Sequence, residues 1–146
     1  MAENNQIIAK LRPEDNFTTR ISVEGHEIIA DEPESAGGKN KGPTPYGLIA
    51  SGLAACTVMT MKWYSQRKGW EVEEFRAFVS HGRDYVEDCE NCEEGKKTQI
   101  YKFEIVIEAD GDLTDEQKLK LIDIANKCPV HRTMTSPIEV HTKFRD

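Results

Sequence analysis

The sequence predicts an α+β fold, because strands and helices follow one another in separate groups rather than as repeated strand–helix–strand units. Two patterns support this prediction. Apolar and polar residues alternate in several short segments, as they do in half-buried strands. One long segment of small and apolar residues follows the dipeptide Thr44-Pro45, which is typical of a helix start. The predicted order is strands, a long helix, a pair of strands, a shorter helix and a last strand.

The first third of the chain is predicted to form strands. Residues 17–23 alternate between apolar and polar side chains, and residues 26–30 return as a second strand after the turn Glu24-Gly25, so the two form a hairpin. An earlier strand is expected around residues 7–11. Residues 31–45 (DEPESAGGKNKGPTP) are rich in glycine, proline and charge, which indicates a loop.

A long helix is predicted from Pro45 to about Lys68, with Thr44 as its capping residue. Its middle is small and apolar on nearly every face, which is the pattern of a helix enclosed by other elements. A pair of strands is expected next, at about residues 70–83 and 99–108. The segment between these strands is acidic and is expected to be exposed.

A shorter helix and a last strand complete the predicted fold. Thr114 and Gln117 form a capping-box pattern for a helix that ends near Lys127. Pro129 disfavours helical geometry at the residue before it, so Cys128 is expected at or just past the C-terminus of this helix. In the last segment apolar and polar residues alternate again, with the apolar set being Ile138, Val140, Thr142 and Phe144.

Length and composition limit the classes of function. A chain of 146 residues is expected to form one domain, over residues 1–146, with a core that needs no disulfides. The net charge of −7 argues against a nucleic-acid partner. The absence of a secretory signal pattern and of an apolar run of ~18 residues argues against export and membrane insertion, so we expect a cytoplasmic protein. In a reducing cytosol, cysteines are more often catalytic or metal-bound than paired in structural disulfides.

Two cysteines stand in distinctive contexts, Cys56 in LIASGLAACTVMT and Cys128 in KCPVHRTM. The local sequence of Cys56 alone favours a small core residue, whereas two such cysteines together suggest a pair that meets in the fold. Cys56 lies about three turns into its helix, so a side chain elsewhere must activate it. At a helix C-terminus the dipole disfavours an anion on Cys128, which Lys127, His131 and Arg132 could offset. This asymmetry suggests a nucleophile at Cys56 and a resolving thiol at Cys128.

The other two cysteines form the sequence Cys89-Glu-Asn-Cys92 in the acidic segment. A zinc site would need two further ligands, for which His81, Asp88 or a partner chain could serve. The alternative is a surface dithiol, whose acidic neighbours would raise the thiol pKa values and slow oxidation. A single CxxC does not define a zinc site, so no metal is predicted. Cys89, Cys92 and His81 are the candidate ligands if one binds.

The segments GPTPYGLIASGLAACT and KCPVHRTM, together with the DEP…GG…GPTP loop, resemble the OsmC/Ohr family of osmotically induced and organic hydroperoxide resistance proteins. The resemblance covers nearly the whole chain and keeps the order of the family's motifs. It implies an OsmC-like fold in which curved antiparallel sheets are wrapped around two central helices. It also implies an intertwined homodimer with its active sites at the subunit interface.

The resemblance further implies a thiol-dependent peroxidase that reduces organic hydroperoxides and needs no bound cofactor. Cys56 matches the peroxidatic cysteine of the family, and Cys128 matches the resolving cysteine. The Cys56 thiolate would attack the peroxide and become a sulfenic acid, Cys128 would condense with it to a disulfide, and an external dithiol would restore both thiols. Arg20 is the favoured activating arginine, and Arg12 is the second choice.

Tyr46 departs from the family pattern. Peroxidase members typically carry a glutamate ten residues before the first cysteine, where it holds the activating arginine, and this chain has Tyr46 followed by Gly47. An arginine without that carboxylate could still lower the pKa of Cys56, although it would be less well fixed. The departure leaves open a non-catalytic relative that binds a small molecule in the interface cavity or senses redox state. A third possibility is a dimer stabilised by zinc through Cys89 and Cys92.

Overall fold

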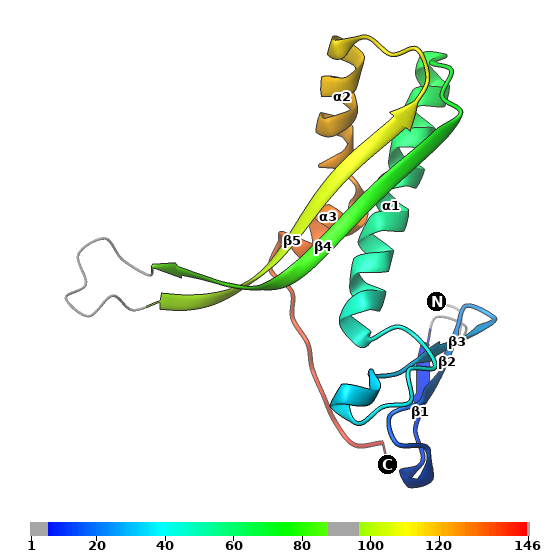
Figure 1. The fold of residues 1–146 in the computed structure, drawn as a ribbon, viewed down its shortest axis with the longest axis vertical. Helices are drawn as coiled ribbons and strands as arrows, with labels where there is room; N and C mark the ends of the chain where they lie inside the picture. The colour runs from blue at the N-terminus through cyan, green and yellow to red at the C-terminus, as the bar shows by residue number, and fades with distance from the viewer. Residues whose placement is uncertain (1–5, 88–96, 146) are drawn as a thin grey trace. The chain divides into compact units, whose positions relative to one another are not determined.

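The structure is a computed structural model that describes residues 6–87 and 97–145. Residues 1–49 and residues 50–146 form two compact units, whose elements are labelled in Figure 1. The combination of antiparallel sheets and helices confirms the predicted α+β class.

The first unit contains a three-stranded antiparallel sheet in the order β1 (Ile8–Lys10), β2 (Thr19–Val23) and β3 (His26–Ala30). β2 pairs with β3 from Thr19 opposite Ala30 to Val23 opposite His26, so the predicted hairpin is confirmed. Glu24 and Gly25 both have positive φ, of 50° and 81°, which is the geometry of a tight hairpin turn. Two short 3₁₀ turns, Pro13–Asp15 and Glu34–Ala36, lie outside the sheet.

Asp31 organises the loop that follows β3. Its buried carboxylate accepts hydrogen bonds from the Thr18 hydroxyl at 2.7 Å and from the backbone amides of Glu32 and Lys41 at 2.7 and 3.1 Å. Burial tends to raise the pKa of Asp31, but these hydrogen bonds outweigh it and hold the pKa below its ordinary value. The loop is therefore built around a carboxylate that stays ionised at neutral pH.

Helix α1 (Pro45–Lys68) has the predicted bounds. Thr44 caps it as expected, because its hydroxyl oxygen accepts a hydrogen bond from the Gly47 amide at 3.0 Å. One face is buried, at residues that recur every three or four positions: Ala50, Leu53, Thr57, Met61 and Ser65. Met59 and Trp63 are 68% and 57% exposed. The prediction that other elements enclose this helix on nearly every face is therefore wrong for a single chain. The other described parts of the chain bury only one side of α1.

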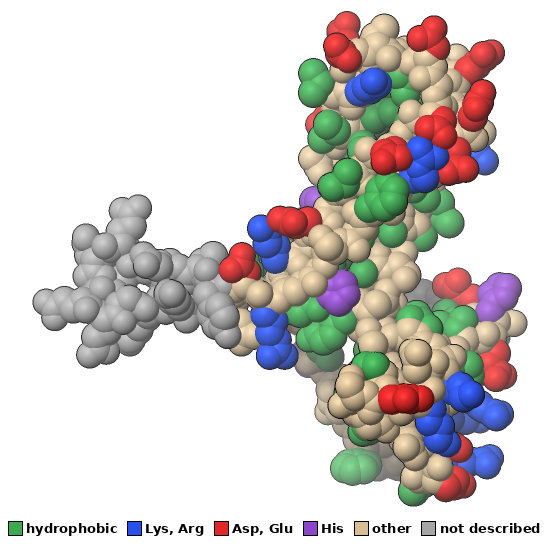
Figure 2. Space-filling view, viewed as in Figure 1, with side chains coloured by type: hydrophobic (Ala, Val, Ile, Leu, Met, Phe, Trp, Pro, Cys, Tyr) green, Lys and Arg blue, Asp and Glu red, His purple; other side chains and the backbone are tan. Residues whose placement is uncertain are grey.

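The second unit is built on a long antiparallel hairpin of β4 (Glu74–Glu87) and β5 (Lys97–Asp110). Alternate residues of the hairpin face inward, and Phe75, Ile107 and Ala109 pack on a buried core of Met61, Leu121 and Ala125. Figure 2 shows hydrophobic side chains that remain at the surface among the charged ones. The hairpin confirms the predicted strand pair, although β4 begins at Glu74 rather than near Trp70.

Two helices follow the hairpin, α2 (Asp115–Ala125) and α3 (Pro129–Met134). The predicted capping box is present, because the Thr114 hydroxyl accepts from the Gln117 amide while the Gln117 side chain accepts from the Thr114 amide. The sequence analysis did not predict α3 as a separate helix.

The predicted last strand is wrong for the single chain. Residues 137–145 have no regular secondary structure, and Val140 and Phe144 are 83% and 98% exposed. A strand needs a neighbouring strand to pair its backbone groups, and neither sheet of the described chain includes this segment.

Candidate thiol site

The structure brings the side chains of Cys56 and Cys128 together. Cys56 lies on α1, where it is half-buried, and Cys128 lies in the short connection between α2 and α3, where it is completely buried. Both are free cysteines, and Cys56 lies near enough to Cys128 to raise the pKa of its thiol. This proximity agrees with the expectation that the two cysteines come together in the fold. Their roles in catalysis stay a prediction at this point.

The backbone around Cys128 explains how its thiol is held. α2 ends at Ala125, and Cys128 then adopts an extended conformation, with φ of −61° and ψ of 141°, as the residue that caps α3. Pro129 occupies the first position of α3, where its missing N–H leaves no partner unsatisfied. The Cys128 Sγ accepts a hydrogen bond from the His131 amide at 3.3 Å.

The predicted place of Cys128, beyond the end of the preceding helix, is confirmed. The electrostatic interpretation attached to it is wrong, because Cys128 also precedes a new helix and its sulfur accepts one of that helix's first amides. The thiol therefore does not face only the carbonyl end of α2. The error arose because α3 is too short to show a helical period in the sequence.

Several neighbours act on the protonation of Cys128. Burial raises the pKa of its thiol above the ordinary value, and the hydrogen bond from the His131 amide acts in the opposite direction. The hydrogen bond and charge of Cys56 raise the pKa further, whereas the Thr57 hydroxyl lowers it. The net result is a pKa above the usual range, so Cys128 is a neutral thiol at neutral pH.

A largely apolar cavity of about 360 Å³ is lined in part by residues that lie three positions from Cys56 and Cys128 in the sequence. Its lining includes Leu53, which lies one turn before Cys56 and Thr57 on α1. It also includes His131, whose amide donates a hydrogen bond to the Cys128 sulfur. The full lining consists of Leu53, Tyr101, Phe103, Ile105, His131, Met134 and Thr135. The rings of Tyr101 and Phe103 lie 5.2 Å apart between centroids, so one wall of the cavity is aromatic. The cavity is suited to an apolar organic group.

The candidate metal ligands do not form a site in the part of the chain that the structure describes. His81 lies on β4, where its ring stacks on Tyr101 with centroids 5.8 Å apart. Cys89 and Cys92 lie outside the described residues. Within the described ranges, no three histidine, cysteine or acidic side chains are grouped closely enough to hold a metal ion.

The residues proposed to activate Cys56 belong to the first unit. Arg20 lies on β2 opposite Ile29, with an exposed side chain, and Arg12 directly precedes the turn Pro13–Asp15. Tyr46 lies in the first turn of α1 and is 46% exposed. The activating role of either arginine stays a prediction.

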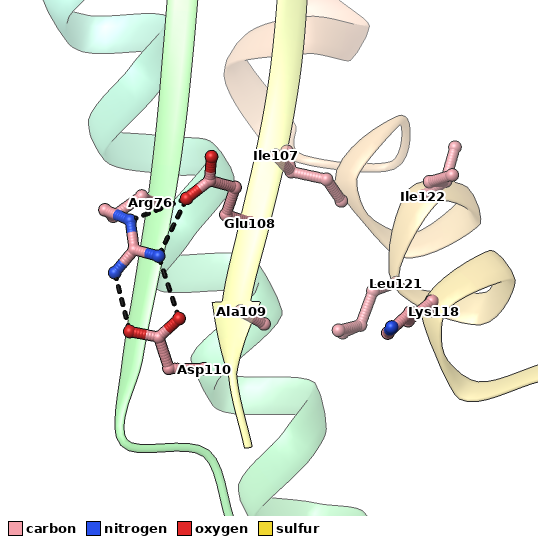
Figure 3. A pocket seen from close by; sticks show the side chains of 8 residues that line it. All are labelled: Arg76, Ile107, Glu108, Ala109, Asp110, Lys118, Leu121 and Ile122. Carbon is pink, nitrogen blue, oxygen red and sulfur yellow. Dashed lines mark hydrogen bonds and ion pairs between the residues drawn. The ribbon is translucent and has the colours of Figure 1, made fainter. Parts of the chain in front are cut away.

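A second cavity, of about 470 Å³, lies between β5 and α2 (Figure 3). Arg76 stands on one side of it, hydrogen-bonded to Glu108 and Asp110, and Leu121 and Ile122 project from α2 on the other side. No described cysteine lines either cavity, but Leu53 and His131 place the smaller one close in sequence to Cys56 and Cys128, whereas no residue of the larger one is near a described cysteine in the sequence.

Sequence reasoning missed Thr57 and the aromatic wall of the cavity. Thr57 is fully buried and lowers the pKa of the Cys128 thiol, yet in the sequence it is one small residue in a run of small residues. Tyr101 and Phe103 could have been found, because they continue the inward-facing alternation of the second strand of the hairpin.

The chain is similar to one known protein family and to several solved structures. The profile of the family described as OsmC-like protein matches residues 38–143. No curated protein matches the sequence significantly. Among the described residues, no helix is long and apolar enough to cross a membrane.

Several solved structures are similar to this chain. An OsmC-like protein from Mycoplasma pneumoniae is 22% identical, with a TM-score of 0.68 over 92% of this chain and 89% of that one. An organic hydroperoxide resistance protein from Elizabethkingia anophelis is 21% identical, with a TM-score of 0.64 over 95% and 94%. The organic hydroperoxide resistance protein OhrB of Bacillus subtilis is 18% identical, with a TM-score of 0.57 over 89% of each chain. At these identities the likeness establishes the fold.

Proposed function

The chain belongs to the family of OsmC-like proteins, and from this premise we propose that it is a thiol-dependent peroxidase that reduces organic hydroperoxides. The observation that carries the proposal is that Cys56 and Cys128, which come from distant parts of the sequence, lie near enough for Cys56 to raise the pKa of Cys128. The structural neighbours described as organic hydroperoxide resistance proteins support the substrate class.

The two cysteines take different roles because they differ in access. Cys56 is half-buried and can be reached by a peroxide, whereas Cys128 is completely buried. The Cys56 thiolate attacks one oxygen of the hydroperoxide, the O–O bond breaks, and the organic part leaves as an alcohol after taking up a proton. Cys56 is oxidised to a sulfenic acid in this step.

Cys128 then resolves the sulfenic acid. Its sulfur attacks the Cys56 sulfur, the S–OH bond breaks, and the hydroxide leaves as water with the proton from the Cys128 thiol. The product is a Cys56–Cys128 disulfide, which an external dithiol reduces by thiol–disulfide exchange. A cytoplasmic location, which we propose for this enzyme, would supply that reductant.

The cavity lined by Leu53 and His131 is proposed to hold the organic part of the substrate. Its aromatic and aliphatic lining favours an apolar group, and its volume of about 360 Å³ fits a substituent of the size of a cumyl group. Hydrogen peroxide gains nothing from this lining, so we expect cumene hydroperoxide to react faster than hydrogen peroxide.

Arg20 is proposed as the cation that lowers the pKa of Cys56, with Arg12 as the second choice. Replacement of the activating arginine by alanine should slow peroxide attack by about tenfold or more, because less Cys56 is ionised. Comparison of Arg20→Ala with Arg12→Ala by stopped-flow kinetics identifies the residue. Unchanged rates in both variants would remove the arginine from the proposal.

We also propose that the enzyme is a homodimer. Large apolar side chains on α1 and in the last segment are exposed in the single chain, including Met59, Trp63, Val140 and Phe144, and surfaces of this kind mark interfaces. Sedimentation analysis should give about twice the mass of the 16.6 kDa chain. Trp63→Asp should weaken the dimer, and Leu119→Asp, at an exposed position on α2, serves as the control.

Turnover of cumene hydroperoxide with an excess of dithiol tests the proposed function. We expect catalytic consumption by the wild type and none above the dithiol background by Cys56→Ser. Equal consumption by the two proteins would refute the peroxidase proposal.

A second candidate is a non-catalytic protein that binds an apolar small molecule or senses redox state. Tyr46, at the position where peroxidase relatives carry a glutamate, is the observation that favours it. A peroxide reaction at Cys56 no faster than that of free cysteine, together with a ligand that co-purifies with the protein, would select this alternative.

A further inference from the structure

Three rings form a cluster on one face of the β4–β5 hairpin. His81 on β4 pairs with Phe103 on β5, and Tyr101 lies two residues before Phe103, so the three side chains share this face. The ring centroid of His81 lies 5.8 Å from that of Tyr101 and 5.9 Å from that of Phe103, and those of Tyr101 and Phe103 lie 5.2 Å apart. Ring pairs attract each other at separations of about 4.5–7 Å, so each ring of the cluster contacts the other two.

A hydrogen bond joins two members of this cluster. The Nδ1 atom of His81 and the hydroxyl oxygen of Tyr101 are 2.5 Å apart. The hydroxyl donates to Nδ1 when that nitrogen carries no hydrogen, and the imidazole donates to the hydroxyl oxygen when it does, so both tautomers keep the bond. The far end of the Tyr101 ring is thereby tied to β4 while its side packs on Phe103. The bond limits the directions in which the Tyr101 ring can point.

His81 is connected to the cavity of about 360 Å³ through its two ring partners. Tyr101 and Phe103 form the aromatic wall of that cavity. His81 is not among the described residues that line it, and His81 itself is exposed. An exposed residue can be exchanged with little change in stability. Substitution of His81 therefore alters the wall from behind, without removing a side chain that a bound molecule touches.

We propose that the cavity selects hydroperoxides whose organic part is an aryl group, and that His81 is the positioning residue for this selection. An aryl ring placed edge-to-face or offset against Tyr101 and Phe103 gains an attraction beyond the burial of its area. A saturated ring of the same size gains from burial alone. The inference rests on the proposed peroxidase function, because it names the substrate class of that same site.

The hydrogen bond between His81 and Tyr101 matters for this selection because ring–ring attraction depends on orientation. A wall that is fixed before the substrate arrives loses little side-chain freedom on binding. Without the bond, the Tyr101 ring is held by packing alone and can leave the favourable orientation. Burial of a saturated ring does not depend on that orientation, so its binding changes little when the bond is lost.

The kinetic test uses two hydroperoxides with the same carbon skeleton, cumene hydroperoxide and 2-cyclohexylpropan-2-yl hydroperoxide. The measured quantity is the ratio of their kcat/KM values, compared between variants so that the intrinsic reactivity of each peroxide cancels. His81→Phe keeps a ring and removes the hydrogen bond, and it should lower the aryl-to-cyclohexyl ratio by about threefold or more. His81→Asn places an amide near the position of Nδ1 and should keep the ratio within about twofold of the wild type.

Two results of this comparison would contradict the inference. An unchanged ratio in His81→Phe would overturn it. An equal fall in His81→Asn and His81→Phe would refute the role of the hydrogen bond.

A double-mutant cycle tests whether His81 acts through Tyr101. Tyr101→Phe keeps the ring in the wall and removes the hydroxyl, so it should lower the ratio by about the same factor as His81→Phe. The variant with both substitutions should show no further fall, because either change alone already removes the hydrogen bond. Effects of the two substitutions that multiply would contradict the inference.

Binding of the corresponding alcohols tests the selection without peroxide chemistry. NMR titration of the reduced protein with 2-phenylpropan-2-ol and with 2-cyclohexylpropan-2-ol gives the ratio of their Kd values. We expect the preference for the aryl alcohol to fall by about threefold or more in His81→Phe and to be kept in His81→Asn. If it falls while the wild type turns over no peroxide, the peroxidase proposal fails and the selection by the aromatic wall stands. An unchanged preference in His81→Phe would overturn the inference, whether or not the protein is a peroxidase.

Discussion

The thiol site and the Arg76 cluster are two polar regions of the same unit, and they are built in opposite ways. Arg76 binds Glu74, Glu108 and Asp110 at 2.7–2.8 Å on the outer face of the β4–β5 hairpin, and all four side chains are partly open to solvent. Cys56 and Cys128 meet under cover, with neutral neighbours and few hydrogen bonds. Each carboxylate of the Arg76 cluster is paired with the guanidinium, whereas the thiol site leaves a reactive atom accessible.

The difference shows what locates chemistry in this fold. The cavity beside Arg76, at about 470 Å³, is larger than the cavity of about 360 Å³ lined by Leu53 and His131, and it is more highly charged. Its carboxylates are paired with Arg76, and they raise the pKa of Arg76 far above any pH at which it could exchange a proton. The larger and more charged cavity therefore belongs to a structural region, whereas the candidate site is identified by the half-buried nucleophile Cys56.

The largest expected contrast between the regions is in activity. Cys56→Ser should lower kcat/KM for cumene hydroperoxide by at least about 10³-fold, because serine is not ionised at neutral pH and cannot form a sulfenic acid. Arg76→Gln should leave kcat/KM within about twofold of the wild type. Steady-state kinetics with an external dithiol measures both. A large loss of activity in Arg76→Gln would show that the charged cluster takes part in the function.

The next contrast is in stability. Leu121 is 2% exposed, belongs to the core and lines the cavity beside Arg76. Leu121→Ala should lower the free energy of unfolding by about 2–5 kcal/mol, as measured by denaturant titration. Leu119→Ala, on the same helix but 68% exposed, is the control and should change it by less than about 0.5 kcal/mol. Similar losses in the two variants would contradict the assigned core.

A smaller effect is the dependence of unfolding stability on pH, which the thiol site should show at alkaline pH and the Arg76 cluster should not. Because burial raises the pKa of Cys128 in the folded protein, the unfolded chain loses this proton first as the pH rises. The thiol's contribution is therefore complete below the ordinary thiol pKa of about 8.5 and is lost as the pH rises toward the folded-state pKa.

The measurement for this prediction is denaturant unfolding between pH 7 and pH 10 under reducing conditions. The stability of the wild type should fall more steeply with pH than that of Cys128→Ser. Arg76 stays charged throughout this range, so the curve of Arg76→Gln should run parallel to that of the wild type. Parallel curves for the wild type and Cys128→Ser would contradict the raised pKa.

The smallest expected effect is the stability lost in Arg76→Gln. Its ion pairs are partly exposed and screened by water, so their removal should lower the melting temperature slightly, and less in 1 M salt than in 0.1 M salt. Differential scanning calorimetry at the two salt concentrations measures this. A loss that does not depend on salt would indicate packing rather than charge as the contribution of Arg76.

The sequence predicted the elements whose signals are local. Thr44 and Pro45 marked the start of α1, Thr114 and Gln117 marked α2, and alternation marked the hairpins. These features depend on neighbouring residues alone, which is why they were readable. The proximity of Cys56 and Cys128 was suggested by two motifs, and in the structure Cys56 lies near enough to raise the pKa of Cys128, which spacing alone could not show.

The features that failed or were missed depend on partners distant in sequence. The alternation of residues 138–144 predicted a strand, but strand formation requires a neighbour that the described chain does not supply. α3 is only six residues long and shows no period, so the setting of Cys128 was misread. Thr57 acquires meaning only when Cys128 is placed beside it.

The most direct test of the thiol pair is to map the product of one turnover. Reduced protein is treated with one equivalent of cumene hydroperoxide without reductant, and the digest is analysed by mass spectrometry before and after reduction. We expect a disulfide that links the peptides of Cys56 and Cys128, and in Cys128→Ser a trapped sulfenic acid at Cys56. Cys56 and Cys128 both recovered as free thiols after consumption of the peroxide would contradict the account.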